Sequence, residues 1–285
     1  MNRSLRLTVI VEDSTSMENP NLLAKHGLSL LVEVEMEDSK QLTLMMDTGP
    51  SADVTLSNMQ SMTINPQEID LIMLSHGHYD HTGGLLGVLR KVGRQTLVIV
   101  HPRAFNPKLK LKPSIKSIGS PYSLSVIERA GGVVLRARNS VALAEGISTS
   151  GEIERGTTFE GVEGFWTIDN GMFMKDDMVD DQALLIRIQD KGLGVITGCA
   201  HAGIINTIRH AQKVMDIDKV YAVVGGFHLA QANNERIETT IRELTSLNPT
   251  MICPCHCTGF KATKQLTEAF GDRCIPLRTG DILRL

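Results

Sequence analysis

The chain has 285 residues, 42% of them hydrophobic and 21% charged, which is enough apolar material for a core that needs no disulfides. A net charge of −3 at pH 7 argues against a nucleic-acid or anionic-membrane partner, and no apolar stretch is long enough to span a bilayer. Five cysteines, three of them crowded into residues 253–257, and no signal-peptide pattern predict a cytoplasmic protein.

The first third of the sequence predicts mostly β-strands. Alternating or apolar runs place them at residues 5–12, 28–36, 41–46, 71–74 and 97–100. Asn65-Pro66 is a helix-start signal, because a capping residue precedes a proline at the first helical position. Apolar residues at helical spacing follow at 85–89, after a cluster of histidines.

The later sequence divides into an irregular part and a regular part. Residues 102–180 predict loops, short strands and a lid over the site, and they include Trp166, the only tryptophan. Strands are then expected at residues 183–188, 194–197, 220–224 and 251–253, and helices at 202–215, 234–247 and 260–270. This pattern predicts an α/β protein whose sheets are covered by helices, with one domain over residues 1–285 and an insertion at 102–180.

The hexapeptide HGHYDH at residues 76–81 places four potential metal ligands within six residues. His76 and His78 are two residues apart, so an extended backbone points both imidazoles the same way. Asp80 and His81 fall on the turn into a helix, where they can face a second ion. Imidazole and carboxylate suit Zn²⁺ best, with Mn²⁺ and Fe²⁺ as alternatives. A surface loop with chance histidines is disfavoured, since three of the nine histidines stand in this motif.

Three further histidines each follow a predicted strand. His201 lies in TGCAHAG, His228 in GGFH and His256 in PCHCTG. Sites in α/β proteins gather at the carboxyl ends of strands, so these histidines are candidates for the same site. Each one taken alone has a satisfied structural role as its alternative.

The hexapeptide resembles the HxHxDH signature of the metallo-β-lactamase superfamily. Asp47-Thr48-Gly49 resembles the upstream aspartate motif of that superfamily, which supports the metal ligands without binding the metal. The resemblance implies the metallo-β-lactamase fold, a four-layer αβ/βα sandwich with the metals at the loop edges of its sheets.

A finer resemblance covers residues 47–261. The hexapeptide, the three later histidine motifs and DDQAL at residues 180–184 are together similar to the dihydropterin-methyl-ribofuranosylaminobenzene-phosphate synthase-like branch. HxHxDH alone is shared by enzymes of many activities, whereas the combination is specific.

The resemblance implies two divalent metal ions with separate ligand sets. One set is His76, His78 and His201, and the other is Asp80, His81 and His256. Cys199 stands where the superfamily usually has a bridging aspartate, so it either supplies a thiolate or is a buried bystander. His228 has no ligand position in the common scheme, and we assign it to substrate contact or proton transfer, with Asp80 as a second candidate for handling protons.

Several other polar residues need a role. Lys261, just past His256, is the better phosphate candidate, whereas the lysines at residues 108–116 are at least as well explained by a solvated loop. Asp181 is the acidic residue nearest the site by family pattern and supports it without binding metal, and we expect most of Asp176, Asp177 and Asp180 to be solvated. Packing is preferred for Cys253, Cys255 and Cys257, because the usual CxxC spacing of a zinc or iron–sulfur site is absent.

The predicted function is a metal-dependent enzyme acting on a phosphorylated small molecule. The branch resemblance suggests C–N bond formation between a pterin diphosphate and an arylamine. The alternative is a metallohydrolase of an ester, thioester, lactone or phosphodiester. A non-catalytic metal-binding module and a nuclease are less favoured, and oligomerisation is left open.

Overall fold

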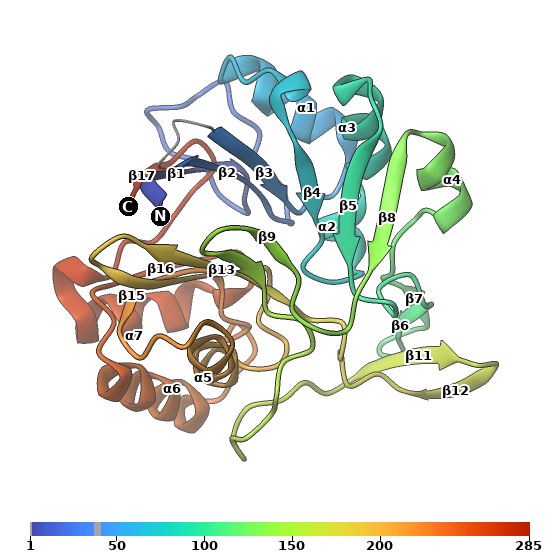
Figure 1. Ribbon diagram of the computed structural model, residues 1–285. Helices are drawn as coiled ribbons and strands as arrows, with labels where there is room; N and C mark the ends of the chain where they lie inside the picture. Colours follow the sequence, from blue (N-terminus) through green and yellow to red (C-terminus); the bar gives the residue numbers. More distant parts are fainter. Residues whose placement is uncertain (1, 37–40) are drawn as a thin grey trace.

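The computed structural model describes residues 2–36 and 41–285. Its main feature is a 13-stranded sheet in two halves that face each other (Figure 1). The first half contains β1 (Asn2–Val11), β2 (Ser29–Met36), β3 (Gln41–Met46), β4 (Leu71–Met73), β5 (Thr96–Val100) and β8 (Gly132–Arg136). The second contains β13 (Ala183–Ile188), β14 (Gly192–Thr197), β15 (Val220–Gly226) and β16 (Met251–Cys255).

Among the described residues, the two halves meet at one parallel pair between β1 and β13, Asn2 with Ile188. Because the connection is so narrow, the sheet folds there and its inner faces pack on each other. Leu7 and Val32 of the first half belong to the same buried cluster as Leu184 and Val224 of the second. Strands β9 (Ala142–Ala144) and β10 (Ile147–Thr149) extend the sheet beside β13, and β17 (Ile282–Arg284) pairs with β1.

Helices cover both outer faces (Figure 1). The first half is covered by α1 (Ala52–Ser61), α3 (Leu85–Val92) and α4 (Leu124–Arg129), and the second by α5 (Ile204–Met215), α6 (Asn234–Leu247) and α7 (Phe260–Phe270). Their buried residues join three clusters separate from the inner core. The resulting four-layer αβ/βα sandwich is the fold predicted from the sequence. Among the described residues, no helix is long and apolar enough to cross a membrane.

The segment 102–180 adds β8, β9 and β10 to the main sheet and also builds a small second sheet. Its strands are β6 (Lys108–Lys110), β7 (Lys116–Ser117), β11 (Phe165–Asp169) and β12 (Met172–Lys175). The β11–β12 hairpin projects from one end of the molecule (Figure 1). Trp166 stacks on Phe173 in this hairpin, with ring centroids 4.9 Å apart.

The helix start predicted at Asn65-Pro66 gives only a 3-10 helix, Pro66–Glu68. The Asn65 side chain caps it by accepting a hydrogen bond from the Gln67 amide at 3.1 Å. The chain then enters β4 within a few residues, so no room remains for a longer helix.

Candidate metal centre

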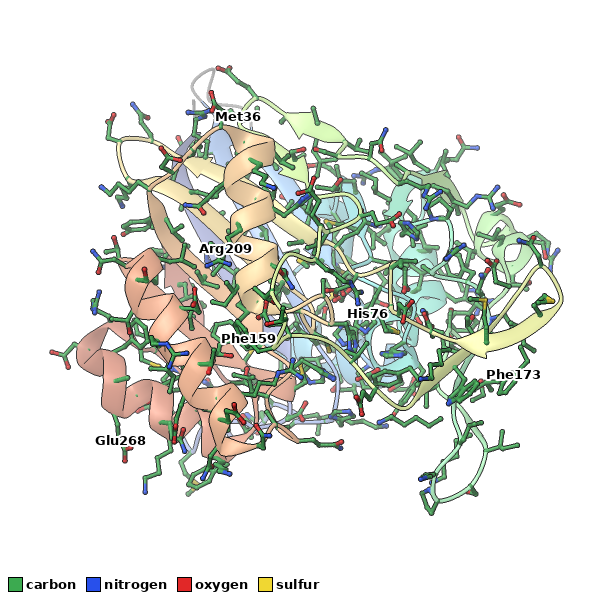
Figure 2. The ribbon with its side chains drawn as sticks, turned by 90° about the horizontal axis from the view of Figure 1, so that it is seen from below. Met36, His76, Phe159, Phe173, Arg209 and Glu268 are labelled. Atoms are coloured by element: carbon green, nitrogen blue, oxygen red, sulfur yellow. The ribbon has the colours of Figure 1, made fainter. Side chains whose placement is uncertain are left out.

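The histidine motif starts in the turn after β4 and runs into α2 (Tyr79–Thr82), and its four candidate ligands are buried. Figure 2 shows His76 in the middle of the molecule. His76 Nε2 lies 3.0 Å from His78 Nδ1. His201, between β14 and α5, comes from the other half of the sheet, and one ring nitrogen from each of these three histidines falls within 4.8 Å of the others. We call His76, His78 and His201 the first position.

Several ring nitrogens of the centre are buried without a hydrogen-bond partner among the described residues. They are Nε2 of His78, both nitrogens of His201, and Nε2 of His256. An unsatisfied buried polar atom costs about 1–3 kcal/mol, so a cluster of them indicates a missing partner. Burial lowers the pKa of His76, His78 and His201 well below the usual value, which keeps them in the neutral form that binds metals.

A second position forms around Asp80, His81 and His256. Asp80 Oδ2 lies 3.8 Å from His81 Nε2 and 3.6 Å from His256 Nε2. His256 follows β16 in the second half of the sheet, whereas Asp80 and His81 belong to α2 of the first. Both positions therefore draw candidate ligands from both halves, and the donor set of imidazoles and carboxylate fits divalent metal ions.

Asp47 contacts a residue of the second position directly and a residue of the first position through Ser75. Its carboxylate accepts hydrogen bonds from the Ser75 amide at 2.7 Å and the Ser75 hydroxyl at 2.6 Å, and lies 2.7 Å from His81 Nδ1. The Ser75 hydroxyl is also 2.9 Å from His76 Nδ1. Burial lowers the pKa of His81, but the charges of Asp47 and Asp80 outweigh it and raise that pKa to about 9. Carboxylates that hold the far nitrogen of a liganding histidine are typical of metal sites.

The Cys199 thiol lies between the two positions. Its Sγ is 3.2 Å from His81 Nε2, and it is within 4.8 Å of a ring nitrogen of His76 and also of His201 and His228. Burial raises the pKa of this thiol well above its usual value. The Cys199 thiol is therefore within ligand distance of candidate ligands from both positions.

His228 lies beside this cluster and is half-buried, with its ring centroid 4.3 Å from that of His201. Cys253 and Cys255 pack into the inner core as expected, but Cys257 does not. Cys257 lies at the site instead, with Sγ 3.5 Å from the Cys199 carbonyl oxygen and within ligand distance of His256. Packing alone is therefore the wrong interpretation for Cys257.

Three residues at the centre are not identified by the sequence patterns. Asp13, just after β1, contacts both His256 and His26, and His26 contacts Asp80. Phe165 covers the first position, with its ring centroid 5.3 Å from that of His78 and 5.4 Å from that of His201. An isolated histidine in a loop carries no signal of its own, and the aromatic residue singled out in the sequence, Trp166, stacks on Phe173.

Lys108 and two aspartates correct the expectation of solvated side chains in this part of the chain. Lys108 is buried, and its Nζ lies 2.9 Å from Asp176 and 2.7 Å from Asp180. Both aspartates are buried as well, because they neutralise the lysine. Asp180 also accepts a hydrogen bond at 2.9 Å from the amide of Gly77, between two candidate ligands. Lys108 is thus not available to a phosphate.

Asp181 and Lys261 differ in their surroundings, since Asp181 is buried and Lys261 is exposed. Asp181 accepts a hydrogen bond at 2.8 Å from the amide of Ala202, the residue after His201. A cavity of about 520 Å³, a size suited to a small molecule, is lined by Asp181, Ala202 and Arg155 among others. Lys261 is exposed in the first turn of α7.

The sequence profile of the Metallo-beta-lactamase superfamily matches residues 25–168. The 7,8-dihydropterin-6-methyl-4-(beta-D-ribofuranosyl)-aminobenzene-5'-phosphate synthase of Methanocaldococcus jannaschii is 37% identical over 287 residues, covering 99% of this chain and 97% of that protein.

Two solved structures share the fold. A metal-dependent hydrolase of the beta-lactamase superfamily superposes with a TM-score of 0.82 at 27% identity, covering 98% of each chain. The Zn(2+)-bound PqqB of Methylobacterium extorquens has a TM-score of 0.56 at 12% identity, covering 98% of this chain and 100% of that one.

These similarities agree with the αβ/βα layers and the buried histidine cluster. The chain belongs to the metallo-β-lactamase superfamily, in the branch similar to the dihydropterin-linked synthase. It is an enzyme of that superfamily, so a purely non-catalytic binding module is excluded.

Proposed function

We propose that this enzyme joins a dihydropterin carrying a methyl diphosphate to a ribofuranosylaminobenzene phosphate. The observation that carries the proposal is the 37% identity to the named synthase over nearly the whole of both chains. The two clustered ligand positions support it, because a diphosphate leaving group needs positive charge close to its oxygens.

In the proposed reaction the arylamine nitrogen forms a bond to the pterin methylene carbon. The bond from that carbon to the diphosphate oxygen breaks, and diphosphate leaves with its electron pair. The amine then loses one proton, and we assign its acceptance to His228, whose half-buried ring lies beside His201. Phe165 covers the rings of His78 and His201 and limits the access of water on that side.

Two divalent ions, which we expect to be Zn²⁺, would supply the charge that neutralises the leaving diphosphate. His76, His78 and His201 would hold one, and Asp80, His81 and His256 the other, with Cys199 as a further candidate thiolate ligand. Asp47 and Asp181 would position these ligands through Ser75, His81 and the Ala202 amide. We assign Lys261 and His228 to substrate contact. We also propose that the protein is located in the cytoplasm.

The test measures diphosphate release from a dihydropterin methyl diphosphate by metal-loaded protein, with and without the arylamine ribose phosphate. Release that requires the arylamine, together with a joined product, is the expected result. A His228→Ala variant should still bind metal but form product more slowly. No release by the wild type under either condition would contradict the proposal.

A hydrolase is the second candidate, because the structure that is 27% identical is a metal-dependent hydrolase. The same assay separates the two functions. Diphosphate release at an equal rate without the arylamine would favour hydrolysis over synthesis.

A further inference from the structure

His26 lies at the second metal position although it belongs to none of the sequence motifs. It stands in the loop between β1 and β2. Its Nδ1 lies 2.9 Å from Asp13 Oδ2, and its Nε2 lies 3.4 Å from Asp80 Oδ2. The ring therefore presents one nitrogen to a supporting carboxylate and the other to a candidate ligand.

His256 makes the same pair of contacts from the opposite side. Its Nδ1 lies 2.7 Å from Asp13 Oδ1, and its Nε2 lies 3.6 Å from the same Asp80 oxygen. The two ring centroids are 4.9 Å apart. Asp13 thus holds two imidazoles at once, with one carboxylate oxygen for each, and turns both Nε2 atoms toward one point.

We infer that His26 is a fourth protein ligand of the second metal position, beside Asp80, His81 and His256, and that Asp13 positions it. This inference rests on the proposed two-metal function. A donor set of three imidazoles and one carboxylate suits Zn²⁺. A carboxylate behind each liganding histidine is the arrangement that fixes ring orientation in metal sites.

The loop holds His26 in place, although 60% of its side chain is exposed. The Gly27 amide donates a hydrogen bond to Asp13 Oδ1 at 3.2 Å, and the Leu28 amide donates one to the Asp80 carbonyl at 3.2 Å. Gly27 has a φ of +146°, and a Cβ there would lie only 2.4 Å from the Asp80 carbonyl oxygen. Because residue 27 is a glycine, the loop can pack closely against the backbone of Asp80, a candidate ligand. A surface histidine without a role at the site would not need this close packing.

With His26 as a ligand, the two positions differ in their number of protein ligands. The second position reaches four protein ligands, the number typical of structural zinc, without using Cys199. The first position has three histidines and reaches four only with that thiol. The second position should therefore hold its ion more tightly, while the first keeps a position for substrate.

The test compares zinc affinity and stoichiometry of the wild type with those of His26→Ala, measured by competition with a chromophoric chelator. In the wild type the tighter of the two zinc sites should be the second position, and in His26→Ala its affinity should fall by at least about 10-fold, because one of its four protein ligands is lost. His210→Ala is the matched control, because the His210 ring bonds the Ser150 carbonyl, away from the centre. It should bind zinc as the wild type does.

Cobalt substitution gives an independent readout. The visible spectrum of the Co²⁺ protein should change in His26→Ala, since one nitrogen donor is lost, but keep its band positions in Asp13→Asn, which retains all donors. Unchanged zinc affinity and an unchanged cobalt spectrum in His26→Ala would overturn the inference.

That result would leave the proposed function intact if the wild type still binds two ions and forms product. A wild type that binds two ions and responds to His26→Ala, but forms no product, would remove the proposed reaction and keep the ligand. A wild type that binds no metal would overturn both.

Discussion

Asp47 contacts both metal positions through Ser75 and His81 and is completely buried. Replacing it by asparagine keeps its size but removes the charge that holds the His81 ring. We expect Asp47→Asn to lower zinc affinity by roughly 10–100-fold, as is usual for residues that support ligands. Isothermal titration with zinc would measure the change.

The matched control for this prediction is Asp53→Asn, the same substitution at an exposed position in the first turn of α1. It should leave zinc affinity unchanged. Equal affinity of Asp47→Asn and wild type would mean that Asp47 only stabilises the turn after β3.

The residues of the centre differ in how far their positions can be predicted from the sequence. His76, His78, Asp80 and His81 are predictable because they are close together in the chain and their spacing carries the signal. Asp13 and His26 are not, because a single carboxylate and a single histidine in a loop have no periodicity and meet only after β1 and β2 pair.

At the scale of elements, the ion pairs of Lys108 connect β6 to Asp176 and Asp180, in the segment just before β13. Asp180 in turn accepts a hydrogen bond from Gly77 of the histidine motif. Lys108→Met would leave Asp176 and Asp180 buried without their cation. We expect it to destabilise the protein by about 3–5 kcal/mol, the cost of breaking a buried ion pair from one side. Urea denaturation would measure the loss.

Lys116→Met provides the control for Lys108→Met, since Lys116 is an exposed lysine of the neighbouring strand β7. Its free energy of unfolding should stay within about 0.5 kcal/mol of wild type. A similar small effect of Lys108→Met would show that the buried pairs contribute nothing.

The start of α5 depends on a residue far away in the sequence. Glu160 accepts hydrogen bonds at 2.9 Å from the amides of Ile205 and Asn206. Gly203, at the helix start, leaves space for that carboxylate, because a Cβ there would lie 2.3 Å from its carbon. A cap supplied from another segment cannot be found by a local capping rule, which explains why the predicted start at residue 202 was two residues early.

We expect Glu160→Ala to lower the free energy of unfolding by about 1–2 kcal/mol, because two amides at the helix start lose their acceptor. Thermal denaturation followed by circular dichroism would detect it. Glu163→Ala, at an exposed position of the same loop, should have no such effect. Equal stability of the two variants would argue against capping by Glu160.

At the scale of the whole molecule, strand and helix alternation predicted the second half closely. The bounds of α6 and α7 match the apolar periodicity residue for residue, because amphipathic helices on a sheet carry a strong local pattern. The small sheet of β6, β7, β11 and β12 could not be assembled in this way. Its strands are short and widely separated, and their pairing depends on contacts that no local pattern encodes.

The candidate metal centre lies between the two halves of the sheet, because each position draws candidate ligands from both halves. Metal should therefore stabilise the whole fold, by about 2.7 kcal/mol when free zinc is 100 times its Kd. Chelation should lower the Tm measured by calorimetry, and added zinc should restore it. A His78→Ala, His256→Ala variant, which lacks one candidate ligand at each position, should show a Tm that barely responds to zinc. If chelation left the wild-type Tm unchanged, the ions would not connect the halves, and the inner core alone would hold them together.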